Sequence, residues 1–160
     1  MCIEAHFGGG YGQVTTNSPV QATTRISFMY GSALQSAEER TAALAILNVA
    51  GGFLCLARKL HACRAEEYES CLKGLLEITG GLRVACIGSS PVISHEFATQ
   101  LVTDPDLADI VLIVADGAIA ESSTSLIDHY QEKKRLIFLG PSFPGFCSLM
   151  NTEHWCPYGR

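Results

Sequence analysis

The sequence has no long apolar run, no extended basic cluster and no closely paired cysteines. None of its hydrophobic stretches approaches the ~18–20 residues of a membrane-spanning helix. The first residues lack the basic start and the apolar segment of a signal peptide. We therefore expect a cytoplasmic protein that has no membrane partner.

Positive charge is also scarce. Eleven Lys and Arg residues stand against 16 Asp and Glu residues, which gives a formal net charge of −5. The only basic cluster is Lys133-Lys134-Arg135, whereas nucleic-acid binding needs a row of cations to neutralise phosphates. We therefore expect no nucleic-acid partner. With 48% hydrophobic and 17% charged residues, the chain is expected to fold as one compact unit or two small lobes.

The seven cysteines include no C-x-x-C pair. An odd number of cysteines without a signal peptide disfavours a disulfide framework, so we expect reduced and mostly buried thiols. No G-x-S-x-G sequence is present, which gives hydrolase chemistry little support. The Gly-rich stretch at residues 8–12 precedes no predicted helix and is therefore no nucleotide-binding loop.

The first 80 residues predict a small β lobe followed by two helices. Residues 1–35 favour two or three short antiparallel strands, one of them at residues 25–30. Ser36 is expected to cap a helix that begins at Ala37, with Glu39 completing a capping box. Gly51-Gly52 is expected to kink or break that helix, and Gly80-Gly81 is expected to end a second helix at residues 65–79.

The second half predicts a parallel sheet. Three short apolar runs, at residues 82–87, 108–115 and 135–139, alternate with helix-like stretches at residues 92–101 and 122–132. A last short strand is expected within residues 154–158. The predicted fold class is α/β: a small parallel Rossmann-like sheet with helices on both faces, preceded by a short antiparallel β-hairpin lobe and two helices. The expected units are a hairpin lobe (1–35), a helical segment (36–80) and a Rossmann-like domain (81–160).

Each of the three predicted strands ends in small or turn-forming residues. In an open parallel sheet these ends lie together and form the usual ligand cleft. Free backbone N–H groups there would bind anionic groups, and Asp116 could hold a cation or accept from a ligand hydroxyl. The alternative is that such turns simply need glycine and helix caps. The candidate ligand-binding residues are Gly88, Ser89, Ser90, Asp116, Gly117, Gly140, Pro141 and Ser142.

Two further clusters carry possible chemistry. Ser123 and Thr124 lie at the start of a predicted helix, where they would act as caps or bind an anionic ligand group. Cys147, His154 and Cys156, with Glu153 between them, combine soft and borderline metal ligands, so a transition metal is a candidate cofactor. Their spacing matches no standard zinc site, and an ordinary C-terminal segment is the alternative.

With these segments placed, the chain resembles the heavy-metal chelation domain family, whose longer members join an enolase-N-terminal-like lobe to a Rossmann-like lobe. The resemblance implies metal-chelate handling in a cleft that uses Asn48, Gly88, Thr124, Gly140, Pro141 and Ser142. Here the first lobe is shortened, and the stretch between Ile87 and Asp109 is too short for the family's helix, strand and loop. The similar stretches are residues 39–48, 81–88, 108–113, 123–127 and 135–144.

The leading hypothesis from the sequence is the binding of a metal ion or a small anionic metal chelate at the strand ends, beside the hairpin lobe. A second hypothesis is an enzyme that acts on a small anionic metabolite in the same cleft, with Asp116 or His95 as acid or base. A third is a non-catalytic interaction subunit, for which a homo-oligomer is the expected partner state.

Overall fold

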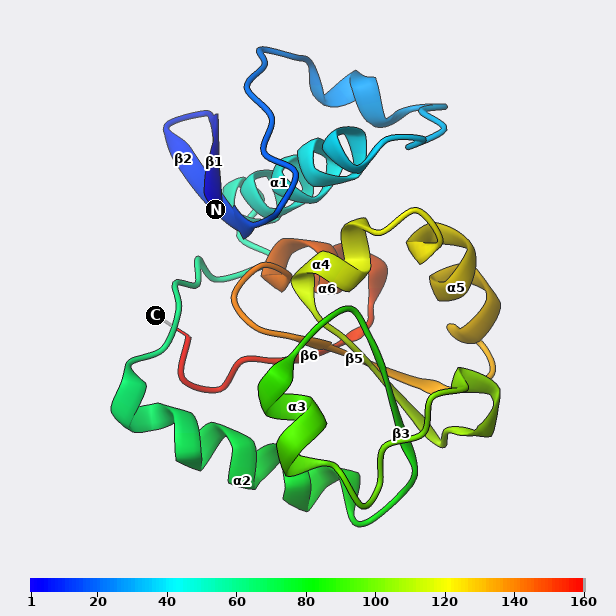
Figure 1. Cartoon of the computed structure of the whole chain (residues 1–160). Coiled ribbons are helices and arrows are strands. Elements are labelled where there is room, and N and C mark those ends of the chain that lie inside the picture. Colours follow the sequence, from blue (N-terminus) through cyan, green and yellow to red (C-terminus); the bar gives the residue numbers. More distant parts are fainter. Residues whose placement is uncertain (160) are drawn as a thin grey trace.

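The computed structural model describes residues 1–159 and has an α/β fold built on a four-stranded parallel sheet (Figure 1). The strands lie in the order β3-β4-β5-β6, and each pairs in parallel with the next. The three predicted apolar runs form the first three strands, and the predicted last strand is confirmed as β6. The strands are β3 (Val84–Ile87), β4 (Ile110–Ile113), β5 (Arg135–Leu139) and β6 (Glu153–Trp155).

An antiparallel hairpin opens the chain. β1 (Cys2–Phe7) pairs with β2 (Gly10–Thr15) through a turn in which Gly8 and Gly9 have positive φ angles of 57° and 77°. Glycine adopts these angles without steric cost. The hairpin packs beside the long helix α1 (Ala37–Phe53), and together they form the N-terminal lobe at the top of Figure 1.

Two local predictions in this lobe differ from the structure. Residues 25–30 contain the 3-10 helix η1 (Ile26–Met29) in place of a third strand, and none of the four η1 residues is buried. α1 continues through Gly51-Gly52 without a break and ends one residue later, at Phe53, so the interruption is displaced from the glycine pair itself. The reason is tertiary packing: a Cβ on Gly51 would lie 2.7 Å from the Cα of Gly145, so the missing side chain lets two helices approach closely.

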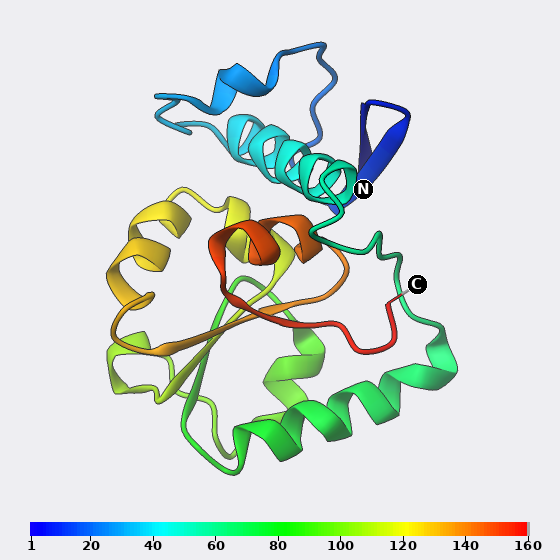
Figure 2. The ribbon, with the colours of Figure 1, turned by 180° about the vertical axis from the view of Figure 1, so that it is seen from behind.

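Helices cover both faces of the sheet (Figure 2), as predicted. Alternate residues of β4 point to opposite faces: Val111 and Ile113 join one hydrophobic core, and Ile110 and Leu112 join the other. The first core lies under α1 and its neighbours, which are α4 (Ala115–Ile119), α5 (Ser123–Tyr130) and α6 (Pro144–Met150). The second lies over α2 (Tyr68–Thr79) and α3 (Pro91–Glu96). The 3-10 helix η2 (Ala65–Glu67), which has no buried residue, leads directly into α2.

The chain reverses its direction across the sheet between β3 and β4. After α3 it forms a single parallel bridge from Leu101 to Val84, on the edge of β3 away from β4. It then passes through η3 (Pro105–Leu107) into β4 and continues outward to β5 and β6. Leu101 thus pairs with the sheet through a single bridge, and the switch point of strand order lies at the carboxyl ends of β3 and β4. This is where α/β proteins usually bind ligands.

The short helices α4 and α6 were not predicted, and α3 is shorter than the predicted helix at residues 92–101. Among residues 1–159, no helix combines the length and apolar character that crossing a membrane requires.

Candidate functional site

Two glycines let the ends of β3 and β4 touch. A Cβ on Gly117 would collide with the carbonyl group of Ile87, and one on Gly88 would lie 2.5 Å from the backbone nitrogen of Gly117. Gly88 also has a φ of +97°. Both glycines were predicted to admit a ligand, but the space at each is filled by the backbone of the other loop. Their structural role is close packing of the two strand ends.

Asp116 stabilises this contact between the ends of β3 and β4 with two hydrogen bonds. Its Oδ2 accepts from the backbone N–H of Ser89 at 2.9 Å, and its Oδ1 accepts from the N–H of Gly117 at 3.0 Å. The Ser89 N–H that was expected to bind an anionic ligand group is therefore donated to this carboxylate. Asp116 joins the loop after β3 to the first turn of α4 and remains at the wall of a groove.

That groove, which we call the switch-point groove, is an open hollow of about 790 Å³ between the N-terminal lobe and the ends of β3 and β4. The lobe supplies one wall with Asn17, Ser18, Gln35, Ala37 and Arg40. The strand ends and α4 supply the other with Gly88, Ser89, Asp116, Ile119, Ala120 and Glu121. Most of these side chains are polar, so the groove suits a hydrated, polar ligand.

Arg40 is the one cation among the described residues of the groove wall. Arg40 as a whole is only 7% exposed to solvent. Nε donates to the carbonyl of Ile119 at 2.7 Å, and Nη1 donates to those of Leu34 and Gln35 at 2.6 and 3.0 Å. Within residues 1–159 the guanidinium has no carboxylate partner, and its Nη2 makes no hydrogen bond. A buried charge without a counter-ion is costly, so this guanidinium is suited to an anion.

Sequence reasoning missed Arg40, although a signal existed. Ser36 caps α1 as predicted by accepting from the Glu39 N–H at 3.1 Å, which fixes where the helix begins. Arg40 is then one turn before Leu44 and shares the apolar face of α1 with it. A charged residue on an apolar helix face indicates a buried interaction that the local pattern cannot name.

Asn48 and the loop after β5 attach the N-terminal lobe to the sheet. Nδ2 of Asn48 donates to the carbonyls of Ser142 and Gln13 at 2.6 and 3.2 Å, and its Oδ1 accepts from the N–H of Gly145 at 3.0 Å. Ser142 Oγ accepts from the Thr15 N–H at 3.0 Å. These predicted ligand-binding groups therefore bind other parts of the chain.

Gly140 and Pro141 offer no N–H to an anion at this loop. The Gly140 N–H is donated to the carbonyl of Trp155 at 3.0 Å, and proline has none. Both residues line a second hollow on the α2 face, together with Ser90, whose Oγ caps α3 by accepting from the Ile93 N–H. The single cleft predicted from the sequence is thus divided in two.

Ser123 and Thr124 lie outside both hollows. Ser123 is fully buried at the start of α5, and its Oγ has no hydrogen-bond partner among the described residues. Thr124 is exposed and borders a small apolar pocket of about 90 Å³ beside Arg40 and Phe143. Neither hydroxyl reaches the switch-point groove.

The predicted metal ligands border a third hollow, separate from the switch-point groove, without forming a metal site. Cys147, His154 and Cys156 border one open hollow beside α6, but the part of the chain that the structure describes contains no group of three or more His, Cys, Asp or Glu residues placed to hold a metal ion. Burial raises the pKa of the Cys147 thiol to about 12 and that of Cys156 to about 11, which disfavours the thiolates that bind metals. Glu153 forms a two-bond ion pair with Arg135.

His154 is expected to make the free energy of unfolding depend on pH. Its Nε2 donates to the Gly140 carbonyl at 2.7 Å, and burial lowers its pKa below the ordinary value. The unfolded chain therefore binds this proton more readily than the fold, so this residue makes the free energy of unfolding decrease as the pH falls below about 6.5. We expect His154→Gln to flatten that decrease in urea titrations. The exposed His95→Gln variant is the control, and equal slopes for the two variants would contradict the assignment.

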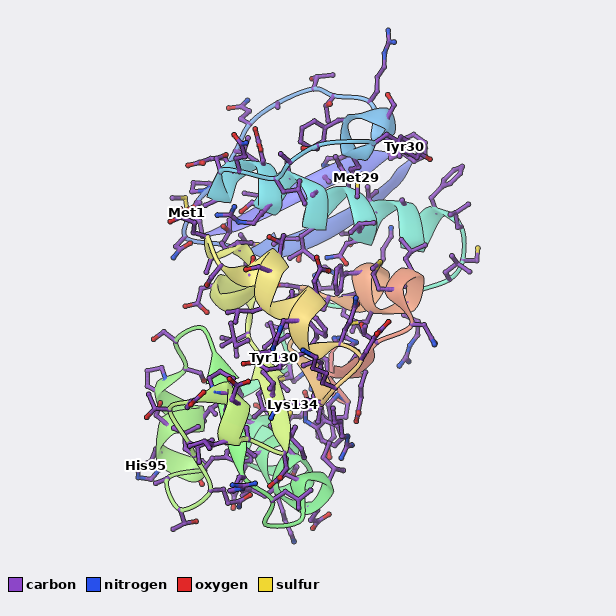
Figure 3. The ribbon with its side chains drawn as sticks, turned by 90° about the vertical axis from the view of Figure 1, so that its right-hand side faces the viewer. Met1, Met29, Tyr30, His95, Tyr130 and Lys134 are labelled. Atoms are coloured by element: carbon purple, nitrogen blue, oxygen red, sulfur yellow. The ribbon has the colours of Figure 1, made fainter. Side chains whose placement is uncertain are left out.

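His95, the alternative acid or base, lies away from the groove. Its side chain is 85% exposed and pairs with Glu96 at 3.0 Å. Figure 3 shows it on the outer side of the sheet domain, at the opposite end from Met29 and Tyr30 of the N-terminal lobe. The structure therefore leaves Asp116 as the only one of the two candidates that borders the groove.

Comparison of the chain with protein-family models, curated proteins and solved structures finds no match. The resemblance to the heavy-metal chelation family therefore stays a hypothesis. What the structure defines is a Rossmann-like α/β fold with a polar groove at its switch point.

Proposed function

We propose that the protein binds a small anionic ligand in the switch-point groove, with Arg40 as the residue that attracts the anion. The observation that carries the proposal is the buried guanidinium at the groove wall, which lacks a carboxylate partner among residues 1–159. An anionic metal chelate is the ligand class that the family resemblance implies. In that class the metal arrives within the ligand, so no protein metal site is required.

Electrostatics supports an anion in one part of the groove only. Three carbonyl oxygens hold the Nε and Nη1 side of Arg40 in place, so the guanidinium is rigid before any ligand binds. Its planar donors suit a carboxylate or a tetrahedral oxyanion. Asp116 and Glu121 border the same groove and would repel a second anionic group, so a ligand with one localised anionic end fits best.

The test is a set of thermal unfolding curves for the purified chain with phosphate, molybdate, citrate, iron citrate, zinc chloride and nickel chloride at constant ionic strength. A ligand that binds only the folded state raises the melting temperature according to its concentration over its Kd. We expect an oxyanion or a chelate to raise it by more than about 1 °C, and the metal chlorides to leave it unchanged. Shifts below that limit for every anion would remove the proposal's support.

Two variants place the site. Arg40→Lys keeps a cation but loses the planar donors, and we expect at least about a tenfold loss of affinity. Because Arg40 also supports the fold, Ala120→Phe provides a second variant that blocks the exposed groove wall without touching Arg40. Ala98→Phe, on an exposed position outside the groove, is its matched control. Equal anion affinity in both phenylalanine variants would place the anion elsewhere.

Self-association and a cytoplasmic location stay part of this proposal. Exposed apolar side chains gather where the hairpin meets the end of α1: the rings of Phe7 and Phe53 are 5.0 Å apart, and Leu54 and Leu56 follow in the chain. These are the side chains that an interface between two copies would cover.

A further inference from the structure

A second hollow, which we call the apolar pocket, lies at the carboxyl ends of β4, β5 and β6 on the α2 face. It has a volume of about 300 Å³, at the lower end of the range for small-molecule sites, and among the described residues it shares no lining residue with the switch-point groove. Its wall includes Leu72 and Leu75 from α2 and Ile93 from α3. The sheet contributes Val114 just after β4, Leu139 at the end of β5 and Trp155 at the end of β6.

Within residues 1–159, no charged side chain lines the apolar pocket. Two of the thiols in its lining are also disfavoured as thiolates, because burial raises the pKa of Cys71 and raises that of Cys156 to about 11. A charged ligand would lose its hydration there without gaining a counter-ion. The pocket therefore disfavours anions and cations alike, in contrast to the groove beside Arg40.

Trp155 gives the pocket a defined wall. A Cβ on Gly74 would lie 3.0 Å from Cζ2 of Trp155, so the glycine allows the indole to pack directly against α2. The indole Nε1 is buried, and no oxygen or nitrogen atom among the described residues accepts its hydrogen. The Cys71 thiol, with which the indole interacts, is only a weak acceptor. Because the protein covers Nε1, the indole contributes ring surface rather than a hydrogen-bond donor to the lining of the pocket.

We infer that the apolar pocket binds an uncharged, largely apolar small molecule that contacts the indole of Trp155. The position agrees with the general rule that ligands bind at the carboxyl ends of parallel strands. The apolar lining supplies the affinity through buried area. This site is independent of the anion site proposed above.

The fluorescence of Trp155 tests this inference directly, because it is the only tryptophan in the chain. The probe is N-phenyl-1-naphthylamine, an uncharged aromatic amine. We expect saturable quenching of the tryptophan emission, together with a rise in the probe's own emission, at one probe per chain. The sulfonated analogue 8-anilinonaphthalene-1-sulfonate should bind at least about tenfold more weakly, because its charge must be desolvated.

Val92→Phe should fill the pocket and weaken probe binding by at least about tenfold, since the added ring competes for the same space. Val102→Phe, outside the pocket, is the matched control. If Val92→Phe fails to fold by circular dichroism, Cys71→Met fills the pocket from α2. Ala120→Phe, which blocks the other groove, should leave probe binding unchanged. Absence of saturable quenching, or equal affinity in the filled and control variants, would overturn the inference.

Discussion

Replacing Gly117 with alanine is expected to destabilise the fold by about 3 kcal/mol or more, at the upper end of overpacking effects. The added Cβ would collide with the carbonyl of Ile87 and lie 2.7 Å from the nitrogen of Gly88. These are backbone atoms at the end of a core strand, so no side-chain rotation relieves the clash. The melting temperature should fall by about 6–12 °C in a chain of this size.

Gly52→Ala is the matched control for this prediction. Gly52 is in α1, and nothing lies within 4 Å of the position that a Cβ would take, so alanine should leave stability unchanged or raise it by up to about 1 kcal/mol. Urea unfolding followed by circular dichroism measures both variants. If Gly117→Ala changes the free energy of unfolding by less than about 0.5 kcal/mol, the contact between the strand ends is not as described.

Asn48→Asp is expected to have the second large effect, a loss of about 3 kcal/mol or more at neutral pH. The substitution keeps the shape of the side chain but replaces its two-hydrogen donor with an oxygen that faces the carbonyls of Ser142 and Gln13. Both carbonyls lose their donor, and a buried carboxylate must be desolvated. The loss should be smaller at acidic pH, where the protonated carboxyl group of the variant would again donate.

An exposed asparagine supplies the comparison. Asn17→Asp changes a residue whose side chain makes only one long hydrogen bond among the described residues, from Ser18 Oγ at 3.5 Å, and should change stability by less than about 0.5 kcal/mol. Parallel urea titrations at neutral and acidic pH measure both variants. A pH-independent effect at Asn48, or one no larger than that at Asn17, would show that this amide does not join the lobe to the sheet.

Features that depend on residues a few positions apart were predictable. Ser36 caps α1 because its hydroxyl reaches the N–H three residues later. Gly80 ends α2 in the left-handed conformation, with a φ of 57°. The three apolar runs became parallel strands because a strand buried on both faces needs apolar residues at every position.

Features that depend on distant partners were not predictable in the same way. Pro144-Gly145 resembles a turn, yet it begins α6, whose glycine packs against the backbone of Asn48. Asn48 itself was expected to bind a ligand, but its hydrogen bonds go to two distant segments, β2 and the stretch from Ser142 to Gly145. Likewise, Nε of Arg40 donates a hydrogen bond to the carbonyl of Ile119, which lies 79 positions further along the chain. Such contacts depend on the relative placement of elements.

By itself, the sequence determined the α/β class, the parallel sheet and the edge of that sheet where ligands are expected. These follow from hydrophobic period, helix caps and glycine stops, which act over one or two turns of chain. Only the tertiary structure decided which groups at that edge remain free. Packing directs Gly88, Gly117, Asp116 and Asn48 toward other parts of the chain and leaves two separate hollows, one beside the Arg40 guanidinium and one beside the Trp155 indole. The physical reason is that a buried polar or close-packed group must find its partner in space, and that partner's position in the sequence is unconstrained.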